Sequence, residues 1–181
     1  MGPGPPEHPW PEPWPGERAR HGGVDEIPLP SVTGRLWVCG KHFVGPDPEA
    51  ALEAVGAQRI VCLCEERELS ERYPGYPRWL SASPAALWFP IPDLHVPPLE
   101  RVVPFLGRLR SLLADGDGLL MHCGAGIGRA GTVSVALLMT MGMERGAAQA
   151  TVADHRPMAG PEAGAQVELL GALATHLRTA R

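Results

Sequence analysis

The chain has 181 residues, enough for one domain with a substantial hydrophobic core. Its 16 basic and 20 acidic residues give a net charge of −4, which argues against a general nucleic-acid binder. No apolar run reaches the roughly 18 residues of a membrane span, and no secretory signal pattern is present. The four cysteines lack zinc-binding spacing, so we expect a cytoplasmic protein with reduced thiols.

Residues 1–30 contain nine of the 21 prolines. Proline lacks a backbone N–H and fixes φ, so this segment cannot sustain a helix or a central strand. We predict a proline-rich, disordered or polyproline-like tail over 1–30 and a single domain over 31–181.

From residue 34 onward, strand and helix patterns alternate. Strands are predicted at "RLWVCG" (35–40), "RIVCLC" (59–64), "ALWFPI" (86–91) and "GLLMHC" (118–123). Helices are predicted at 47–57, where Asp47 is the N-cap and Pro48 follows, at 65–73, 98–116, 129–143, 145–155 and 161–179. This alternation predicts an α/β fold, with a central, mostly parallel sheet of about four to five strands flanked by helices.

The segment "HCGAGIGRAGT" (122–132) lies between a strand and a helix and fits two patterns. It contains a G-x-G-x-x-G match, and it also fits His-Cys-x5-Arg. A dinucleotide-binding unit needs a second parallel strand with an acidic residue about 20 positions on, but the sequence after 131 looks helical throughout. No Lys-Ser/Thr pair follows the glycines, which excludes a P-loop nucleotide site.

The second pattern places a cysteine nucleophile in an anion cradle. The residues between Cys123 and Arg129 can curl so that their N–H groups point at one anion, and glycine permits the positive φ values this requires. The candidate phosphate-binding residues are Gly124, Ala125, Gly126, Ile127, Gly128 and Arg129. The same field should lower the pKa of Cys123, while the planar fork of Arg129 can grip two phosphate oxygens. We expect His122 to orient the loop through backbone hydrogen bonds.

These residues resemble the HCxxGxxR signature of cysteine-based phosphatases, in particular the compact, atypical dual-specificity protein phosphatases. The resemblance extends over about 34–179 and includes "IVCLCEERE", "IPDLHVPP" and the "RP…Q" pattern in 156–166. It implies a protein tyrosine phosphatase-like fold and hydrolysis through a cysteinyl-phosphate, with no metal and no organic cofactor.

The leaving oxygen needs a proton donor, and Asp93 is the candidate general acid. It follows a predicted strand among prolines, about 30 residues before Cys123, as the acid loop does in the family. The alternative is an ordinary turn aspartate. His95, two residues on, is interpreted as a loop histidine. Gln166 matches the family position that helps to place the hydrolytic water; the alternative is an exposed helix glutamine.

Two features of the sequence modify this interpretation. Ala130 stands where the family has a Ser or Thr whose hydroxyl assists the departing thiolate, so slowed breakdown of the phosphoenzyme is expected. Thr132 lies about 200° around the helix and Ser134 a turn deeper, so neither replaces that hydroxyl. Cys64 is either a small buried hydrophobe or, because "LCEER" resembles relatives with a cysteine near the nucleophile, a redox partner of Cys123.

The sequence therefore predicts a monomeric tyrosine or dual-specificity phosphatase that acts on phosphorylated proteins. One alternative is a phosphatase for a small phosphorylated metabolite, and the loop without lysine disfavours polyphosphorylated lipids. Another alternative is a phosphate-binding module with weak turnover. Sulfur transfer is a further possible function of a cysteine in an anion-binding loop, but it would give Asp93 no catalytic role.

Overall fold

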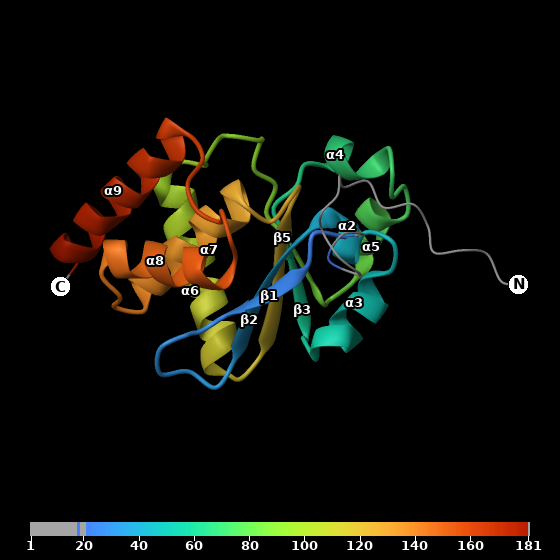
Figure 1. Ribbon diagram of the computed structural model, residues 1–181, viewed down its shortest axis with the longest axis horizontal. Helices are drawn as coiled ribbons and strands as arrows, with labels where there is room; N and C mark the ends of the chain where they lie inside the picture. The colour runs from blue at the N-terminus through green and yellow to red at the C-terminus, as the bar shows by residue number, and fades with distance from the viewer. Residues whose placement is uncertain (1–17, 19–20, 181) are drawn as a thin grey trace, which may run out of the picture.

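The computed structural model describes residue 18 and residues 21–180 (Figure 1). Within them, five strands form one sheet in the order β1-β2-β5-β3-β4. The strands are β1 (Val24–Ile27), β2 (Arg35–Gly40), β3 (Arg59–Cys62), β4 (Ala86–Trp88) and β5 (Gly118–Cys123). All neighbours are parallel except β1, which pairs antiparallel with β2 at one edge. The predicted α/β fold with a mostly parallel sheet is confirmed.

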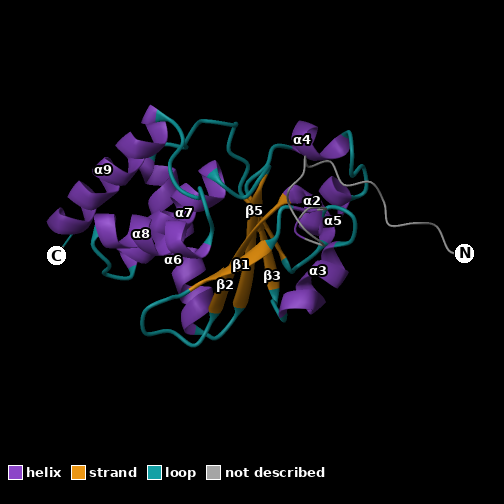
Figure 2. Ribbon diagram, in the orientation of Figure 1, coloured by secondary structure: helices purple, strands orange, loops and turns teal. Residues whose placement is uncertain are grey.

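Helices cover both faces of the sheet (Figures 1 and 2). One layer contains α6 (Leu99–Ala114), α7 (Gly128–Thr140), α8 (Arg145–His155) and α9 (Gly164–Thr179), and the other contains α2 (Lys41–Val44), α3 (Pro48–Val55), α4 (Glu66–Ser70) and α5 (Tyr76–Ala82). Because both faces are covered, the central strands are apolar along nearly their whole length. None of the helices described here has the length and apolar character of a membrane span.

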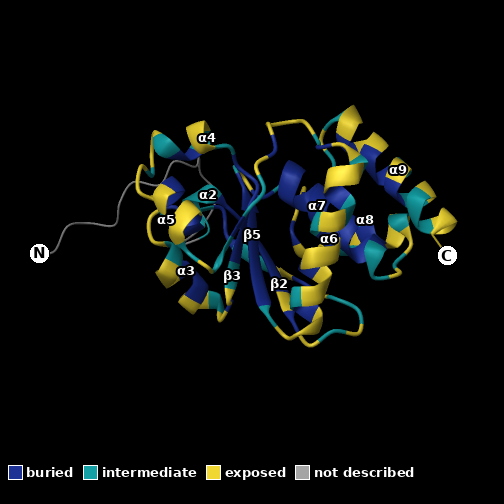
Figure 3. Cartoon of the chain, turned by 180° about the vertical axis from the view of Figure 1, so that it is seen from behind, coloured by how far each residue is buried: buried dark blue, intermediate teal, exposed yellow. Residues whose placement is uncertain are grey.

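The centre of the molecule is formed by β5 and α7, which are consecutive in the sequence. Every residue of β5 is buried, as is every residue from Gly128 to Met139 in α7 (Figure 3). The 123–129 loop that joins them leaves the carboxyl end of the middle strand, with β2 and β3 on either side. Ligands bind at this place in open α/β sheets.

Local signals set several element boundaries as predicted. Asp47 caps α3 by accepting a hydrogen bond from the N–H of Ala50 at 3.0 Å, and Pro48 is the first helical residue. The helix ends at Gly56, whose φ of +70° is favourable for glycine. The short helices α2 and α5 were not predicted.

The predicted tail is corrected at its C-terminal end. Residues 24–27 form β1, with Asp25 opposite Val38 and Ile27 opposite Leu36. The reason is local: "GVDEI" contains no proline, and an edge strand needs hydrogen bonds on one side only. Residues 1–17 and 19–20 of the predicted tail lie outside the described residues.

Candidate active site

The backbone of the 123–129 loop is turned so that its carbonyl groups face outward. The carbonyl of Gly124 accepts from the N–H of Lys41 at 2.9 Å, and that of Ile127 accepts from the N–H of Gly131 at 2.9 Å. Arg156 donates to the carbonyls of Ala125 at 2.9 Å and Gly126 at 2.6 Å. In a trans peptide, the N–H of the next residue points away from the carbonyl. The N–H groups of residues 125–128 therefore face the inside of the loop, as an anion cradle requires.

Cys123 lies at the base of this loop and is 3% exposed. Burial raises the pKa of its thiol, while the N–H of Ala130, the charge of Arg129 and the N–H of Ile127 lower it. The net direction is upward, so the predicted lowering of the Cys123 pKa is wrong. The reason is that burial disfavours the charged thiolate more strongly than Arg129 and the two N–H groups stabilise it.

Arg129 is held by an acidic side chain that the sequence did not single out. Its Nη1 and Nη2 atoms donate to the two carboxylate oxygens of Glu68 at 2.8 and 2.7 Å, and Nη1 also donates to the carbonyl of Ile91 at 2.8 Å. The Nε atom is buried and has no hydrogen-bond partner within the described residues. The two terminal nitrogens of Arg129, which were expected to bind phosphate, thus bind Glu68. The side of the guanidinium formed by Nε and Nη2 is the one that can still bind an anion.

Asp93 lies at the mouth of the site, 3.4 Å from Nη2 of Arg129, with its side chain 69% exposed. Its carboxylate accepts from the N–H of Leu94 at 3.1 Å, and Leu94 has a φ of +61°. His95 contacts the backbone carbonyl of Asp93 through Nδ1 at 2.6 Å rather than the carboxylate. The carboxylate therefore remains directed to solvent beside Arg129.

His122 is fully buried next to the nucleophile. Its Nδ1 lies 3.3 Å from the carbonyl oxygen of Cys123, and its Nε2 lies 2.7 Å from the hydroxyl of Tyr76. Tyr76 belongs to α5 on the other side of the sheet and was not identified from the sequence. Two contacts on opposite sides of the ring fix the imidazole against the base of the loop.

Gln166 is buried at the start of α9, next to α7. Its Oε1 accepts from the N–H of Glu162 at 2.7 Å and from the hydroxyl of Thr132 at 3.4 Å. Its Nε2 is buried without a partner among the residues described. The interpretation of Gln166 as an exposed helix residue is wrong, because α9 packs this face against α7.

The hydroxyls near Ala130 point away from Cys123, as predicted. Thr132 donates to Gln166, and Ser134 contacts the sulfur of Met121 in β5 at 3.8 Å. Ala130 itself is fully buried. Neither hydroxyl takes the place of the missing one at position 130.

Cys64 is buried just beyond the end of β3. Its carbonyl accepts from Nε1 of Trp88 at 2.8 Å, which fixes the backbone at this position. The Cys62 hydrogen bond and burial both raise the pKa of the Cys64 thiol, and the charge of Cys64 in turn raises the pKa of Cys123. All four cysteines are free thiols.

Three functional neighbours were not assigned to the site from the sequence, because they come from distant parts of the chain. Glu68 is 61 residues from Arg129, Tyr76 is 46 residues from His122, and Arg156 is 30 residues from Gly126. The "EERE" segment contained one sequence signal for Glu68. Glu65 and Glu68 form a capping box at the start of α4, in which each side chain accepts from the other residue's N–H, and this turns Glu68 inward. No group of His, Cys, Asp or Glu within the described residues is arranged to hold a metal ion.

Comparison with solved structures finds proteins of the same architecture. Tk-PTP in its active form is 28% identical, with 81% of this chain and 97% of that chain covered and a TM-score of 0.64. Kinase associated phosphatase, with its catalytic cysteine substituted by serine, is 22% identical, with 86% and 96% covered and a TM-score of 0.71. The human tyrosine phosphatase-like serine/threonine/tyrosine-interacting protein is 20% identical, with 84% and 97% covered and a TM-score of 0.65.

A comparison with curated proteins gives no match. A family model, however, matches residues 37–175, which include Cys123, Arg129, Asp93 and Gln166. Its description is PTP-SAK, Swiss Army Knife protein, DSP-PTPase phosphatase domain. The chain therefore belongs to the PTP-SAK family of DSP-PTPase phosphatase domains, and it is a cysteine-dependent phosphatase of the dual-specificity type.

Proposed function

We propose that this protein hydrolyses phosphomonoesters in two steps at Cys123. In the first step the thiolate attacks phosphorus, so an S–P bond forms while the P–O ester bond breaks. Asp93, as the carboxylic acid, gives its proton to the leaving oxygen. In the second step a water oxygen attacks phosphorus, the S–P bond breaks, and the Asp93 carboxylate takes the proton of the water.

The observation that supports this proposal best is the outward orientation of four successive loop carbonyls above Cys123. The inward N–H groups and the Nε edge of Arg129 would stabilise the equatorial oxygens of the transferring phosphoryl group. Asp93 lies on the side of Arg129 that faces solvent, where a leaving group would be exposed.

Gln166 suits the second step. Its Oε1 is already bound by two donors, so its unpartnered Nε2 group is available to a water molecule. We propose that it positions the hydrolytic water while Asp93 acts as the base.

A phosphorylated protein is the substrate class that we favour, with a small monophosphorylated metabolite as the alternative. The rim supports a single phosphate group: the loop has no lysine, Asp93 is exposed, and the Glu162 carboxylate lies directly against Gly128. Further phosphates on a ligand would meet these negative charges. A phosphate-binding module with weak turnover is favoured only by Ala130.

We also infer that the protein is a cytoplasmic monomer that does not bind nucleic acid. The four free thiols suit a reducing compartment, and the net charge of −4 disfavours polyanions.

We further propose that Cys64 protects the nucleophile from oxidation. Peroxide converts the Cys123 thiolate to a sulfenic acid, and attack by the Cys64 sulfur would form a disulfide and release water. Mass spectrometry after mild peroxide treatment should find the Cys64–Cys123 peptide, and Cys62→Ser is the matched control that should leave it intact. Only over-oxidised Cys123 in the wild type would refute this role.

An aryl phosphate assay tests the main proposal. The wild-type protein should turn over p-nitrophenyl phosphate, whereas Cys123→Ser should abolish turnover. Asp93→Asn should reduce kcat by about 10²-fold or more, and the exposed Asp154→Asn should not. Absence of wild-type turnover, with phosphopeptide binding retained, would instead establish a binding module.

A further inference from the structure

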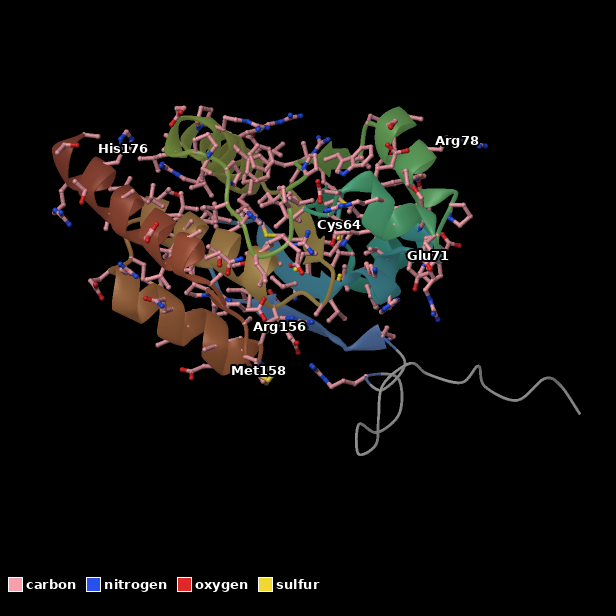
Figure 4. The ribbon with its side chains drawn as sticks, turned by 90° about the horizontal axis from the view of Figure 1, so that it is seen from above. Cys64, Glu71, Arg78, Arg156, Met158 and His176 are labelled. Atoms are coloured by element: carbon pink, nitrogen blue, oxygen red, sulfur yellow. The ribbon has the colours of Figure 1, made fainter. Side chains whose placement is uncertain are left out.

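The outer side of the phosphate loop, residues 123–129, is held by a single buried guanidinium. Arg156, the residue that ends α8, is 3% exposed. Its Nε donates to the carbonyl of Gly126 at 2.6 Å and its Nη2 to that of Ala125 at 2.9 Å. Its remaining nitrogen, Nη1, donates to the carboxylate of Asp25 at 2.6 Å and to the carbonyl of Gly23 at 3.3 Å. Figure 4 shows Arg156 where the end of α8 meets strand β1.

This arrangement sets the direction of two cradle N–H groups. Because Arg156 holds the carbonyls of Ala125 and Gly126 outward, the N–H groups of Gly126 and Ile127 point inward. The contact is close: a Cβ on Gly126, whose φ is +73°, would lie 2.8 Å from Nη2 of Arg156 and would collide with the carbonyl of Cys39. Only glycine therefore fits at this position while Arg156 holds the carbonyls.

Asp25 is the acidic side chain that forms an ion pair with Arg156. Its side chain is only 14% exposed, and the pairing of Asp25 with Val38 fixes its backbone in β1. Arg18 contacts the other carboxylate oxygen. A buried guanidinium without a counter-charge is costly, and it would be drawn toward the thiolate or the phosphate instead of the carbonyls. Asp25 thus favours the orientation in which Arg156 holds the loop.

The family match begins at residue 37, so it includes Arg156 but not Asp25. The N-terminal strand consequently adds, from outside the matched region, a carboxylate that binds the arginine holding the catalytic loop. We propose that Asp25 is a positioning residue that acts through Arg156 to keep the phosphate loop in its anion-binding conformation. This inference rests on the proposed function, since the anion is the substrate phosphate.

The test compares two neighbouring carboxylates of β1 in the full chain. Asp25→Asn removes the charge next to Arg156, whereas Glu26→Gln removes the same charge from an exposed pair with Arg35. Calorimetric titration with inorganic phosphate should show Kd raised about tenfold in Asp25→Asn and unchanged in Glu26→Gln. With p-nitrophenyl phosphate, kcat/KM should fall by a similar factor in Asp25→Asn only.

A purely structural role would lower the melting temperature and the amount of active protein without changing Kd for phosphate. If Asp25→Asn does not fold, Asp25→Glu keeps the charge but shifts it by one methylene, and a smaller rise in Kd, still above twofold, is expected. A Kd within twofold of wild type, or a lower Kd, would overturn the proposal. If the wild-type protein binds phosphate but shows no turnover, the proposed activity is contradicted. The phosphate titrations would still test the role of Asp25, because they do not depend on turnover.

Discussion

At residue scale, the feature that distinguishes this site is the methyl group of Ala130. Its N–H helps to stabilise the Cys123 thiolate, but its side chain offers no hydrogen bond to the sulfur when the S–P bond breaks. The hydroxyls of Thr132 and Ser134 are directed to Gln166 and Met121. Breakdown of the phosphoenzyme should therefore be the slow step, and rapid-mixing experiments should show a burst of product.

Ala130→Ser should restore the missing donor. A single donor aimed at a developing negative charge contributes about 10²–10³-fold at most, and we expect a rise in the steady-state rate of about tenfold together with a smaller burst. Ala136→Ser, on the same buried helix but away from the loop, controls for the cost of burying a hydroxyl. Unchanged turnover in Ala130→Ser would show that phosphoenzyme breakdown does not limit the reaction.

The site residues that were predicted and those that were missed differ in how their position in the sequence relates to the phosphate loop. Cys123 and Arg129 share one seven-residue loop, so their spacing alone places them around an anion. Asp93 follows a strand that neighbours β3 in the sheet, which brings it to the same edge. Glu68, Tyr76 and Arg156 reach the loop only through tertiary packing, and a single sequence gives no measure of such contacts.

At the scale of elements, α4 matters because it presents Glu68 to Arg129. Burial alone would raise the pKa of Glu68, but the hydrogen bonds from Arg129 and the N–H of Glu65 outweigh burial and lower it. The ionised carboxylate therefore stabilises the fold at pH values above its unfolded pKa of about 4.3, and this contribution is lost as pH falls through the folded value.

Glu68→Gln should consequently have two effects. One acceptor is lost, either for Arg129 or for the N–H of Glu65, so kcat/KM should fall by about tenfold. The stability difference from wild type, measured by urea unfolding, should be largest above pH 5 and should shrink below pH 4. Glu66→Gln, an exposed change on the same helix, should show neither effect. A stability difference that is constant with pH would contradict the role of the ion pair.

At the scale of the whole molecule, the sequence predicted the sheet and its helices because long apolar runs and caps mark them. It missed β1, since the prolines on both sides of "GVDEI" dominated the composition of that region. The strand nevertheless belongs to the domain: Ile27 is 1% exposed within the hydrophobic core, and Asp25 binds Arg156, which in turn holds the phosphate loop. The described contacts begin at Arg18, which pairs with Asp25.

Two truncations locate the functional start of the domain. Removal of residues 1–17 keeps every contact described above and serves as the reference for the longer truncation. Removal of residues 1–27 takes away β1, uncovers the edge of β2 and buries Arg156 without its carboxylate. Losing the burial of Ile27 alone costs about 2–5 kcal/mol, and the melting temperature should fall by about 10 °C. Because Arg156 then lacks its partner, phosphate binding by the folded fraction should weaken as well. Equal melting temperatures and equal phosphate affinities for the two truncations would place the N-terminal boundary of the domain after β1.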